Sequence, residues 1–155
     1  MPSTVQPLYP LLFIHIFLYP SPFTRYPIFM PKAEGRRYDF LDESTIDTGA
    51  LETLPYAGRE QKITVDTLEF SAVCPYSGLP DYGRIVIEYV PNDKIVELKS
   101  FKYYLVSFRN VGIYQEDAID RVYDDVKGLL SPKKLKVNLR YNTRGGIDVT
   151  CEMED

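Results

Sequence analysis

The chain of 155 residues carries a net charge of -4 at pH 7, and 45% of its residues are hydrophobic. This length is enough for one domain with a sizeable core, and the mildly acidic balance argues against direct binding to nucleic acid. A single histidine and two cysteines argue against a zinc site of the usual kind, so we expect no metal. Because two cysteines make no disulfide framework, we expect a reduced protein of the cytoplasm.

Residues 1–29 differ in composition from the rest of the chain. They hold no acidic residue, one arginine and half of the prolines. The apolar run at 11–18 is too short to cross a bilayer, and no basic residue precedes it as in a secretory signal, so we expect no membrane association. We interpret 1–29 as an extension outside the domain, Met30 as a candidate true start and 30–155 as a single domain. Recovery of peptides from 1–29 from the native host would contradict this hypothesis.

Two runs in the middle of the chain have the pattern of strands. Residues 30–60, which precede them, are polar and acidic and predict an arm with short turns. Apolar residues at 63, 65, 68 and 70 predict a strand with an irregularity in its alternation. The run 84–90 is rich in β-branched residues, and turn-forming residues follow it at 91–93. We expect the two runs to pair antiparallel.

The second half of the chain predicts two helices and two further strands. Apolar residues recur at helical spacing over 97–109 and 116–130 and alternate over 135–141 and 147–153, with a glycine turn at 144–146. This order is typical of an α+β fold with two helices on one face of an antiparallel four-stranded sheet. The open edges of such a sheet favour pairing between subunits, so we expect a homo-oligomer.

The segment from Cys74 to Asp81 holds the candidate chemistry. A thiol attacks an electrophilic carbon as the thiolate, and a nearby carboxyl group can protonate what the attack creates. Gly78 and Pro80 can turn the chain so that both side chains line one pocket. A lone cysteine is more often a small buried core residue, and an aspartate in such a turn is more often a turn former. The motifs that follow favour the chemical interpretation.

Four motifs of the chain resemble those of one enzyme family. The octapeptide Glu-Leu-Lys-Ser-Phe-Lys-Tyr-Tyr occupies 97–104, and Cys-Pro…Gly…Pro-Asp occupies 74–81. Ser-Phe-Arg-Asn at 107–110 and Arg-Gly-Gly at 144–146 complete the match. With these motifs, the region 70–153 resembles the NADPH-dependent 7-cyano-7-deazaguanine reductases in their short single-module form. The resemblance implies the tunnelling fold, in which subunits join their sheets into rings and two rings stack.

The resemblance also implies a role for each matching residue. Cys74 matches the nucleophile that forms a thioimide with the substrate nitrile, and Asp81 matches the proton donor. The positions that hold the deazaguanine base are Val96, Glu97, Leu98, Gln115 and Glu116. The positions that contact NADPH are Lys99, Lys102 and Arg144. The family often has a histidine where Gln115 stands, and an amide can hydrogen-bond a ligand without carrying a charge or donating a proton to it.

The implied reaction is the NADPH-dependent reduction of 7-cyano-7-deazaguanine to 7-aminomethyl-7-deazaguanine, in the biosynthesis of queuosine in tRNA. The sequence has no Gly-x-Gly-x-x-Gly motif, so we expect the dinucleotide at a boundary between subunits rather than in a Rossmann crevice.

Alternative interpretations differ in which motifs they require. An amidinotransferase that acts on the same nitrile in tRNA without reduction would share Cys74 and Asp81 but not need the octapeptide. A non-catalytic oligomeric binding protein would need neither, and a metal-dependent pterin enzyme of the same fold would need the histidines that are missing. For Glu97, Lys99 and Lys102, the alternative is a solvated first turn of a helix.

Overall fold

The computed structural model of the chain describes residues 32–155. The predicted extension 1–29 and the candidate start Met30 lie outside these residues, so the proposed division of the chain stays a prediction. Between residues 32 and 155, no helix is both long and apolar enough to cross a membrane.

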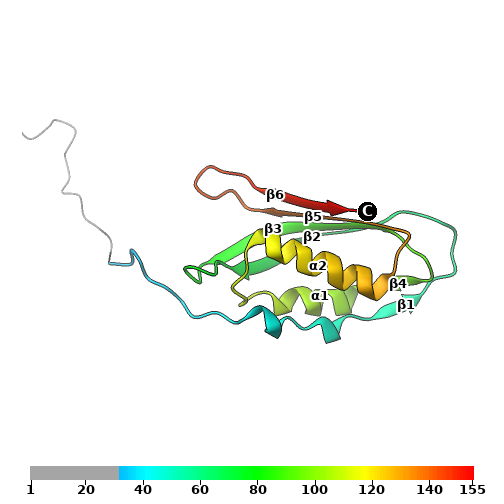
Figure 1. Cartoon of the computed structure of the whole chain (residues 1–155), viewed down its shortest axis with the longest axis horizontal. Helices are drawn as coiled ribbons and strands as arrows, with labels where there is room; N and C mark the ends of the chain where they lie inside the picture. Colours follow the sequence, from blue (N-terminus) through cyan, green and yellow to red (C-terminus); the bar gives the residue numbers. More distant parts are fainter. Residues whose placement is uncertain (1–31) are drawn as a thin grey trace, which may run out of the picture. The chain divides into compact units, whose positions relative to one another are not determined.

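An antiparallel sheet of four strands forms the body of the fold. Its strands are ordered β2 (Ile63–Val73), β3 (Pro80–Val90), β5 (Lys134–Tyr141) and β6 (Thr150–Glu154). The two helices, α1 (Leu98–Ser107) and α2 (Gln115–Leu130), cover one face of this sheet (Figure 1). The predicted α+β architecture is thereby confirmed.

Two short strands form a separate small sheet that the sequence did not predict. β1 (Thr53–Pro55) pairs antiparallel with β4 (Lys94–Val96). Strands of this length are too short to show an alternation of apolar and polar residues, so their pattern resembles that of a loop. Single 3-10 turns at Glu43–Thr45 and Thr48–Ala50 precede β1, in the segment predicted as an arm with short turns.

The pairing of β2 with β3 extends further than predicted. It continues to Val73 opposite Pro80, so β3 begins at Pro80 rather than at 84. Asp81 therefore lies in a strand and not in a turn. The predicted irregularity of β2 is confirmed by a shift of the register between Thr67 and Phe70.

The last strand is shorter than predicted. β6 begins at Thr150 instead of 147, because Ile147 forms an isolated bridge with Arg144 across the turn. Gly145 and Gly146 make this turn with φ values of +58° and +78°, which residues with a side chain rarely adopt. The predicted glycine turn is confirmed, but it occupies more of the chain than the alternating pattern indicated.

Gly83 lets two aromatic rings meet across the sheet. It lies on β3 between Phe70 of β2 and Tyr141 of β5. A Cβ atom at this position would lie 2.7 Å from the carbonyl oxygen of Arg140 and 2.8 Å from the Tyr141 ring, so a side chain does not fit. The rings of Phe70 and Tyr141 stack with their centroids 6.1 Å apart. Such a contact stabilises by about 0.5–1.5 kcal/mol beyond the area that it buries.

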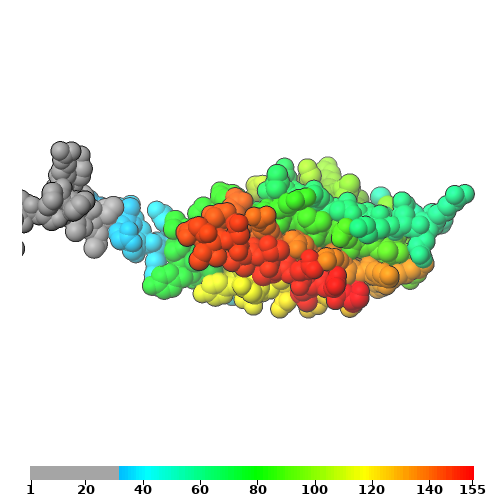
Figure 2. All heavy atoms as spheres, turned by 90° about the horizontal axis from the view of Figure 1, so that it is seen from above, coloured from blue at the N-terminus to red at the C-terminus, as the bar shows by residue number. Residues whose placement is uncertain are grey.

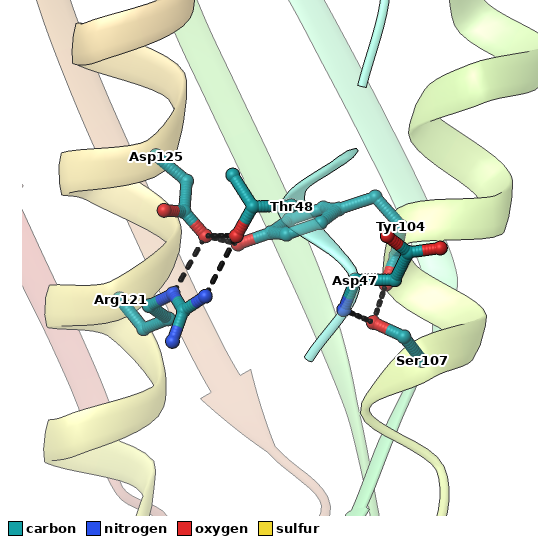
Figure 3. A network of polar contacts seen from close by, with 6 residues as sticks. All are labelled: Asp47, Thr48, Tyr104, Ser107, Arg121 and Asp125. Atoms are coloured by element: carbon teal, nitrogen blue, oxygen red, sulfur yellow. Dashed lines mark hydrogen bonds and ion pairs between the residues drawn. The ribbon is translucent and has the colours of Figure 1, made fainter. Parts of the chain in front are cut away.

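A polar network attaches the segment before β1 to both helices (Figure 3). Its centre is Asp125 of α2, whose Oδ2 atom accepts from the hydroxyl of Tyr104 at 2.8 Å and from Nε of Arg121 at 2.7 Å. The hydroxyl of Thr48 donates to Asp125 at 3.2 Å and accepts from Arg121 at 2.6 Å. Burial, and then the neighbouring Asp125, raise the pKa of Tyr104 far above its usual value, so this hydroxyl stays a donor.

We expect Asp125→Ala to lower the free energy of unfolding by about 1–3 kcal/mol, since it leaves the buried hydroxyl of Tyr104 without its acceptor. Urea denaturation followed by circular dichroism measures the change. Asp124→Ala, at an exposed position of the same helix, is the matched control and should change stability by less than about 0.5 kcal/mol. Equal effects of the two substitutions would contradict the role that we assign to the network.

Candidate active site

The loop between β2 and β3 presents Cys74 at one end of the sheet. Two backbone hydrogen bonds close this loop, from Cys74 N to Leu79 O at 2.9 Å and from Gly78 N to Cys74 O at 2.8 Å. Gly78 has a φ of +70° and lies against the carbonyl group of Tyr38, where a Cβ atom would collide. The loop is therefore compact, and it holds the partly buried thiol in a defined place.

The surroundings of Cys74 favour its thiolate. Burial by itself would raise the pKa of the thiol, but hydrogen bonds from the hydroxyl of Ser77 and from the backbone of Tyr76 and Ser77 outweigh burial, so the pKa is lowered. The negative charge of Asp81 acts in the opposite direction, which places the carboxylate within electrostatic reach of the sulfur. A lowered pKa is what a nucleophilic thiol requires, and the role of Cys74 as nucleophile stays a prediction.

Asp81 lies on β3 opposite Ala72 of β2, and nine-tenths of its surface is buried. Its Oδ1 atom accepts a hydrogen bond from Nη1 of Arg144 at 2.8 Å. Arg144 comes from the turn between β5 and β6, and its side chain is half exposed. Its guanidinium also lies over the ring of Tyr141, 5.0 Å from the centroid. The structure thus brings together Cys74, Asp81 and Arg144, which the sequence had placed in two separate motifs.

Gln115 and Glu116 begin α2 at this same end of the molecule, where the β2–β3 loop and the β5–β6 turn also lie (Figure 1 and Figure 2). The side-chain amide of Gln115 donates to the carbonyl oxygens of Leu139 at 2.8 Å and Val149 at 3.1 Å. Because both neighbours are acceptors, the nitrogen faces them, and Oε1 is left buried without a partner among residues 32–155. Glu116 is exposed.

Tyr141 lies beside Arg144 and Asp81 and is a candidate site residue that the sequence did not single out. Its hydroxyl is buried and has no hydrogen-bond partner in the described part of the chain. Burial, and next the charge of Asp81, raise the pKa of Tyr141, so the hydroxyl is protonated and can donate. The signal in the sequence was an aromatic residue at the end of an alternating strand, shortly before Arg144. That pattern is equally typical of core packing.

Glu97 belongs to a second group of residues, at the start of α1. Its carboxylate caps the helix by accepting from the backbone N–H of Lys99 at 3.0 Å and of Ser100 at 2.6 Å. These two hydrogen bonds lower the pKa of Glu97, and the bond from the N–H of Lys99 has the larger effect. Glu97 therefore has a structural role at the start of the helix, in line with the alternative interpretation from the sequence. Carboxylate lone pairs not used by these two bonds can still accept from a ligand.

Within one chain, this second group of residues lies far from Cys74 and Asp81. The N–H of Val96, next to Glu97, donates to the hydroxyl of Tyr89 at 3.3 Å. Tyr89 lies eight positions along β3 from Asp81, which is about 26 Å at about 3.3 Å per residue. Figure 1 shows the start of α1 beside β4, at the opposite end of the sheet from the β2–β3 loop. No single base can contact Glu97 and Cys74 of the same chain.

A groove of about 510 Å³ runs between α1 and β2. Its lining includes Lys99, Lys102 and Arg109, and none of these three cations forms an ion pair within residues 32–155. Apolar side chains of α1 line the same groove, among them the exposed Leu98 and Tyr103. Unpaired cations beside an apolar wall suit a ligand with phosphate groups and a flat ring.

The chain resembles known proteins over most of its length. Residues 80–155 match the family model described as QueF-like protein. The NADPH-dependent 7-cyano-7-deazaguanine reductase of Thermotoga maritima is 57% identical over 125 residues, which cover 80% of this chain and 91% of that protein. The protein of the same name from Caldicellulosiruptor bescii is 49% identical over 118 residues, which cover 75% and 90%.

A solved structure resembles the fold. It is described as the archaeosine synthase QueF-Like in the apo form, with a TM-score of 0.55 and 22% identity, and the match covers 64% of this chain and 95% of that one. At this identity the likeness concerns the fold alone. It confirms the tunnelling fold expected from the motifs for the single chain, and the rings of subunits stay a prediction. In residues 32–155, no cluster of His, Cys, Asp and Glu side chains has the arrangement of a metal site.

We expect Ser77→Ala to raise the pKa of Cys74, because the hydroxyl of Ser77 is the strongest of the groups that lower it. The rate of alkylation by iodoacetamide, measured against pH, should then rise at a higher pH than in the unchanged protein. Thr143→Ala removes a hydroxyl from the β5–β6 turn instead and is the control. An unchanged pH profile for Ser77→Ala would show that Ser77 does not stabilise the thiolate.

Proposed function

Because the chain belongs to the family of NADPH-dependent 7-cyano-7-deazaguanine reductases, we propose that it reduces the nitrile of 7-cyano-7-deazaguanine to an aminomethyl group, in the biosynthesis of queuosine in tRNA. The observation that supports this most directly is a thiol of lowered pKa beside a carboxyl group that is nine-tenths buried. A nucleophile and an acid at one end of a sheet are what addition to a nitrile requires.

In the addition to the nitrile, Cys74 acts as the nucleophile and Asp81 as the proton donor. The thiolate of Cys74 forms a C–S bond with the nitrile carbon, and the electron pair of one C–N π bond moves to the nitrogen. Asp81 supplies the proton that this nitrogen takes up, which gives the thioimide. Conversion of a nitrile to a primary amine takes two hydrides, which two molecules of NADPH supply. Between the two hydride additions the nitrogen lone pair forms a C=N bond as the C–S bond breaks, and Cys74 leaves as the thiolate. A second proton taken up by the nitrogen completes the amine, so two hydrides and two protons are consumed.

Acceptor atoms at the start of each helix suit the base. The edge of a deazaguanine presents adjacent N–H donors, which a carboxylate accepts well in a bidentate manner. Glu116, the buried Oε1 of Gln115 and Glu97 are such acceptors. Leu98 is exposed and can contact the base, whereas the side chain of Val96 is buried. The assignment of these five residues to the base remains a proposal.

The separation of Glu97 from Cys74 supports a site shared between two subunits. The strands β2 and β6 are the edges of the sheet, and edge strands of two subunits can pair. Leu68, on β2, is 77% exposed, and apolar residues of α1 beside the groove are exposed too. Contact with a neighbouring subunit would bury them and would bring Glu97 of one subunit toward Cys74 of the next. We therefore propose a homo-oligomer with a site at each boundary.

The residues of the groove fit the cofactor. Lys99 and Lys102 are cations without a partner in the described residues, beside an apolar wall, and they can hold the phosphates of NADPH. Arg144 lies in the other half of the shared site, next to Cys74 and Asp81. When bound, NADPH supplies hydride to the carbon that Cys74 holds.

The alternatives receive less support. The unpaired cations of the octapeptide suit a dinucleotide, which a tRNA amidinotransferase without reduction does not need. A thiol with a lowered pKa is unnecessary in a protein that only binds. Direct binding of nucleic acid is not part of the proposal, and a cytoplasmic location remains a prediction from the sequence.

We expect Cys74→Ala to abolish both turnover and the covalent adduct, which intact-mass spectrometry detects after incubation with 7-cyano-7-deazaguanine. Asp81→Asn should slow substrate-dependent oxidation of NADPH about a hundredfold or more, while the adduct-forming thiol remains. Cys151→Ala is the control, because burial raises the pKa of that thiol; it should leave adduct and turnover in place. Turnover by Cys74→Ala would exclude the proposed mechanism.

A shared site predicts that two variants impaired in opposite halves of the site complement each other, at a substrate concentration well below the Kd of the Glu97→Gln variant. Glu97→Gln should weaken binding of the base about ten- to a hundredfold. Co-expression with Cys74→Ala should restore up to about a quarter of the activity, because random pairing places both native residues in about one boundary in four. Cys74→Ala with Asp81→Asn, both from the same half of the site, is the control and should restore none. Light scattering should show a multi-subunit particle, and a fully active monomer would contradict the shared site.

A further inference from the structure

A short arm of the chain lies against the loop that carries Cys74. The arm consists of residues 37–41, all of which are exposed. The N–H of Tyr38 donates to the carbonyl oxygen of Ser77 at 2.9 Å. Gly78, the next residue of the loop, lies against the carbonyl group of Tyr38. One end of the arm is therefore joined to the second half of the loop.

The other end of the arm is joined to the connection between α1 and α2, residues 108–114. The N–H of Leu41 donates to the carbonyl oxygen of Asn110 at 2.7 Å, and the N–H of Gly112 donates to that of Leu41 at 3.0 Å. The ring of Phe40 covers Gly112 so closely that a Cβ atom there would collide with it. Main-chain hydrogen bonds and one ring contact thus hold the arm to the connection.

The same connection holds the end of β2. The N–H of Val73, the residue before Cys74, donates to the carbonyl oxygen of Val111 at 3.0 Å. The N–H of Ile113 in turn donates to the carbonyl oxygen of Val73 at 3.2 Å. The connection therefore lies between β2 and the arm, with a parallel bridge to each of them. The loop is held on the side before Cys74 by the connection and on the side after it by the arm.

We propose that the arm is a positioning element for the nucleophile, because it fixes Ser77 and its neighbours where their hydroxyl and N–H groups face the sulfur of Cys74. The inference rests on the proposed function only in taking Cys74 as the nucleophile. The donors are the hydroxyl of Ser77 and the backbone N–H groups of Tyr76 and Ser77, which lower the pKa of the thiol. Hydrogen bonds weaken steeply as their geometry worsens, so a loop that is free to move would stabilise the thiolate less. No residue of the arm is buried, so loosening it should affect the loop more than the core.

Charged groups also lie around the loop. The charge of Asp81, on β3, acts against the thiolate of Cys74, and Arg144 pairs with this carboxylate at 2.8 Å. Arg37 of the arm lies over the ring of Tyr76, 4.2 Å from its centroid. These charges are unchanged when an uncharged contact of the arm is altered, so such a change isolates the effect of position.

Substitutions at the contact between Phe40 and Gly112 test the proposal in the full-length protein. Phe40→Ala removes the ring, and Gly112→Ala adds a methyl group that displaces it. Mass spectrometry of the Cys74 peptide measures alkylation by iodoacetamide against pH. In each variant the midpoint should rise, and the rate well below it should fall about three- to tenfold, as expected when a hydrogen bond to the sulfur is weakened.

A double variant and a control complete the test. In the Phe40→Ala protein, Gly112→Ala should have no further effect, because the added methyl group no longer meets a ring. Leu54→Ala changes a residue of β1 that is 48% exposed, similar to the 43% of Phe40. As the control it should leave the midpoint unchanged. Phe40→Leu serves as a second variant if Phe40→Ala does not fold.

The midpoint separates positioning from simple shielding of the thiol. An arm that only covers Cys74 would, when loosened, raise the rate at every pH and leave the midpoint in place, and this result in both single variants would overturn the proposal. An equal shift from Gly112→Ala with and without the ring of Phe40 would overturn it too. Alkylation uses neither substrate nor cofactor, so these results leave the reductase function in place. A shifted midpoint in a protein that does not oxidise NADPH with the nitrile would overturn only that function.

Discussion

The pairing of β2 with β3 is the constraint on which the rest of the structure depends. Its register places Val73 opposite Pro80, so the loop that carries Cys74 and the start of the strand that carries Asp81 meet at one end of the sheet. The same strand continues to Tyr89, whose hydroxyl holds Val96 at the other end. A rigid strand therefore sets both the closeness of the nucleophile to the acid and the distance of both from Glu97.

Packing and polar contacts hold this arrangement from both sides. The Phe70 and Tyr141 rings, which meet across Gly83, tie the edge strand β2 to the inner strand β5 close to Asp81. On the helix side, the bonds of Asp125 connect α2 with α1 and with the segment before β1. The strands and helices that carry the site are thus held in place by the ring contact and by the hydrogen bonds of Asp125, which have no proposed part in the reaction.

The strands and helices with strong periodicity were predictable from the sequence, and so was the family from its motifs. The failures have physical causes. β1 and β4 are too short for an alternation to be visible, and the start of β3 was hidden because Pro80 and Asp81 are residues typical of turns. Ile147 continued the alternation of β6, yet the glycine turn holds it out of the sheet.

The candidate site was predictable in its residues but not in its geometry. Spacing along the chain predicted that Cys74 and Asp81 lie near each other, whereas the contact of Asp81 with Arg144 joins residues 63 positions apart and had no signal in the spacing. The distance between Glu97 and Cys74 within one chain also follows from tertiary structure alone. The pattern around Tyr141 did not distinguish a site residue from a core residue, because an aromatic residue in an alternating strand is typical of core packing.

The two bonds of the Gln115 amide have a consequence for acid tolerance. They link the last part of β5 to the segment that leads into β6, through the carbonyl oxygens of Leu139 and Val149. An imidazole at this position would change its charge in the range of physiological pH, and its hydrogen bonds would change with it. A carboxamide carries no such charge, so this junction keeps the same donors from mildly acidic to alkaline conditions.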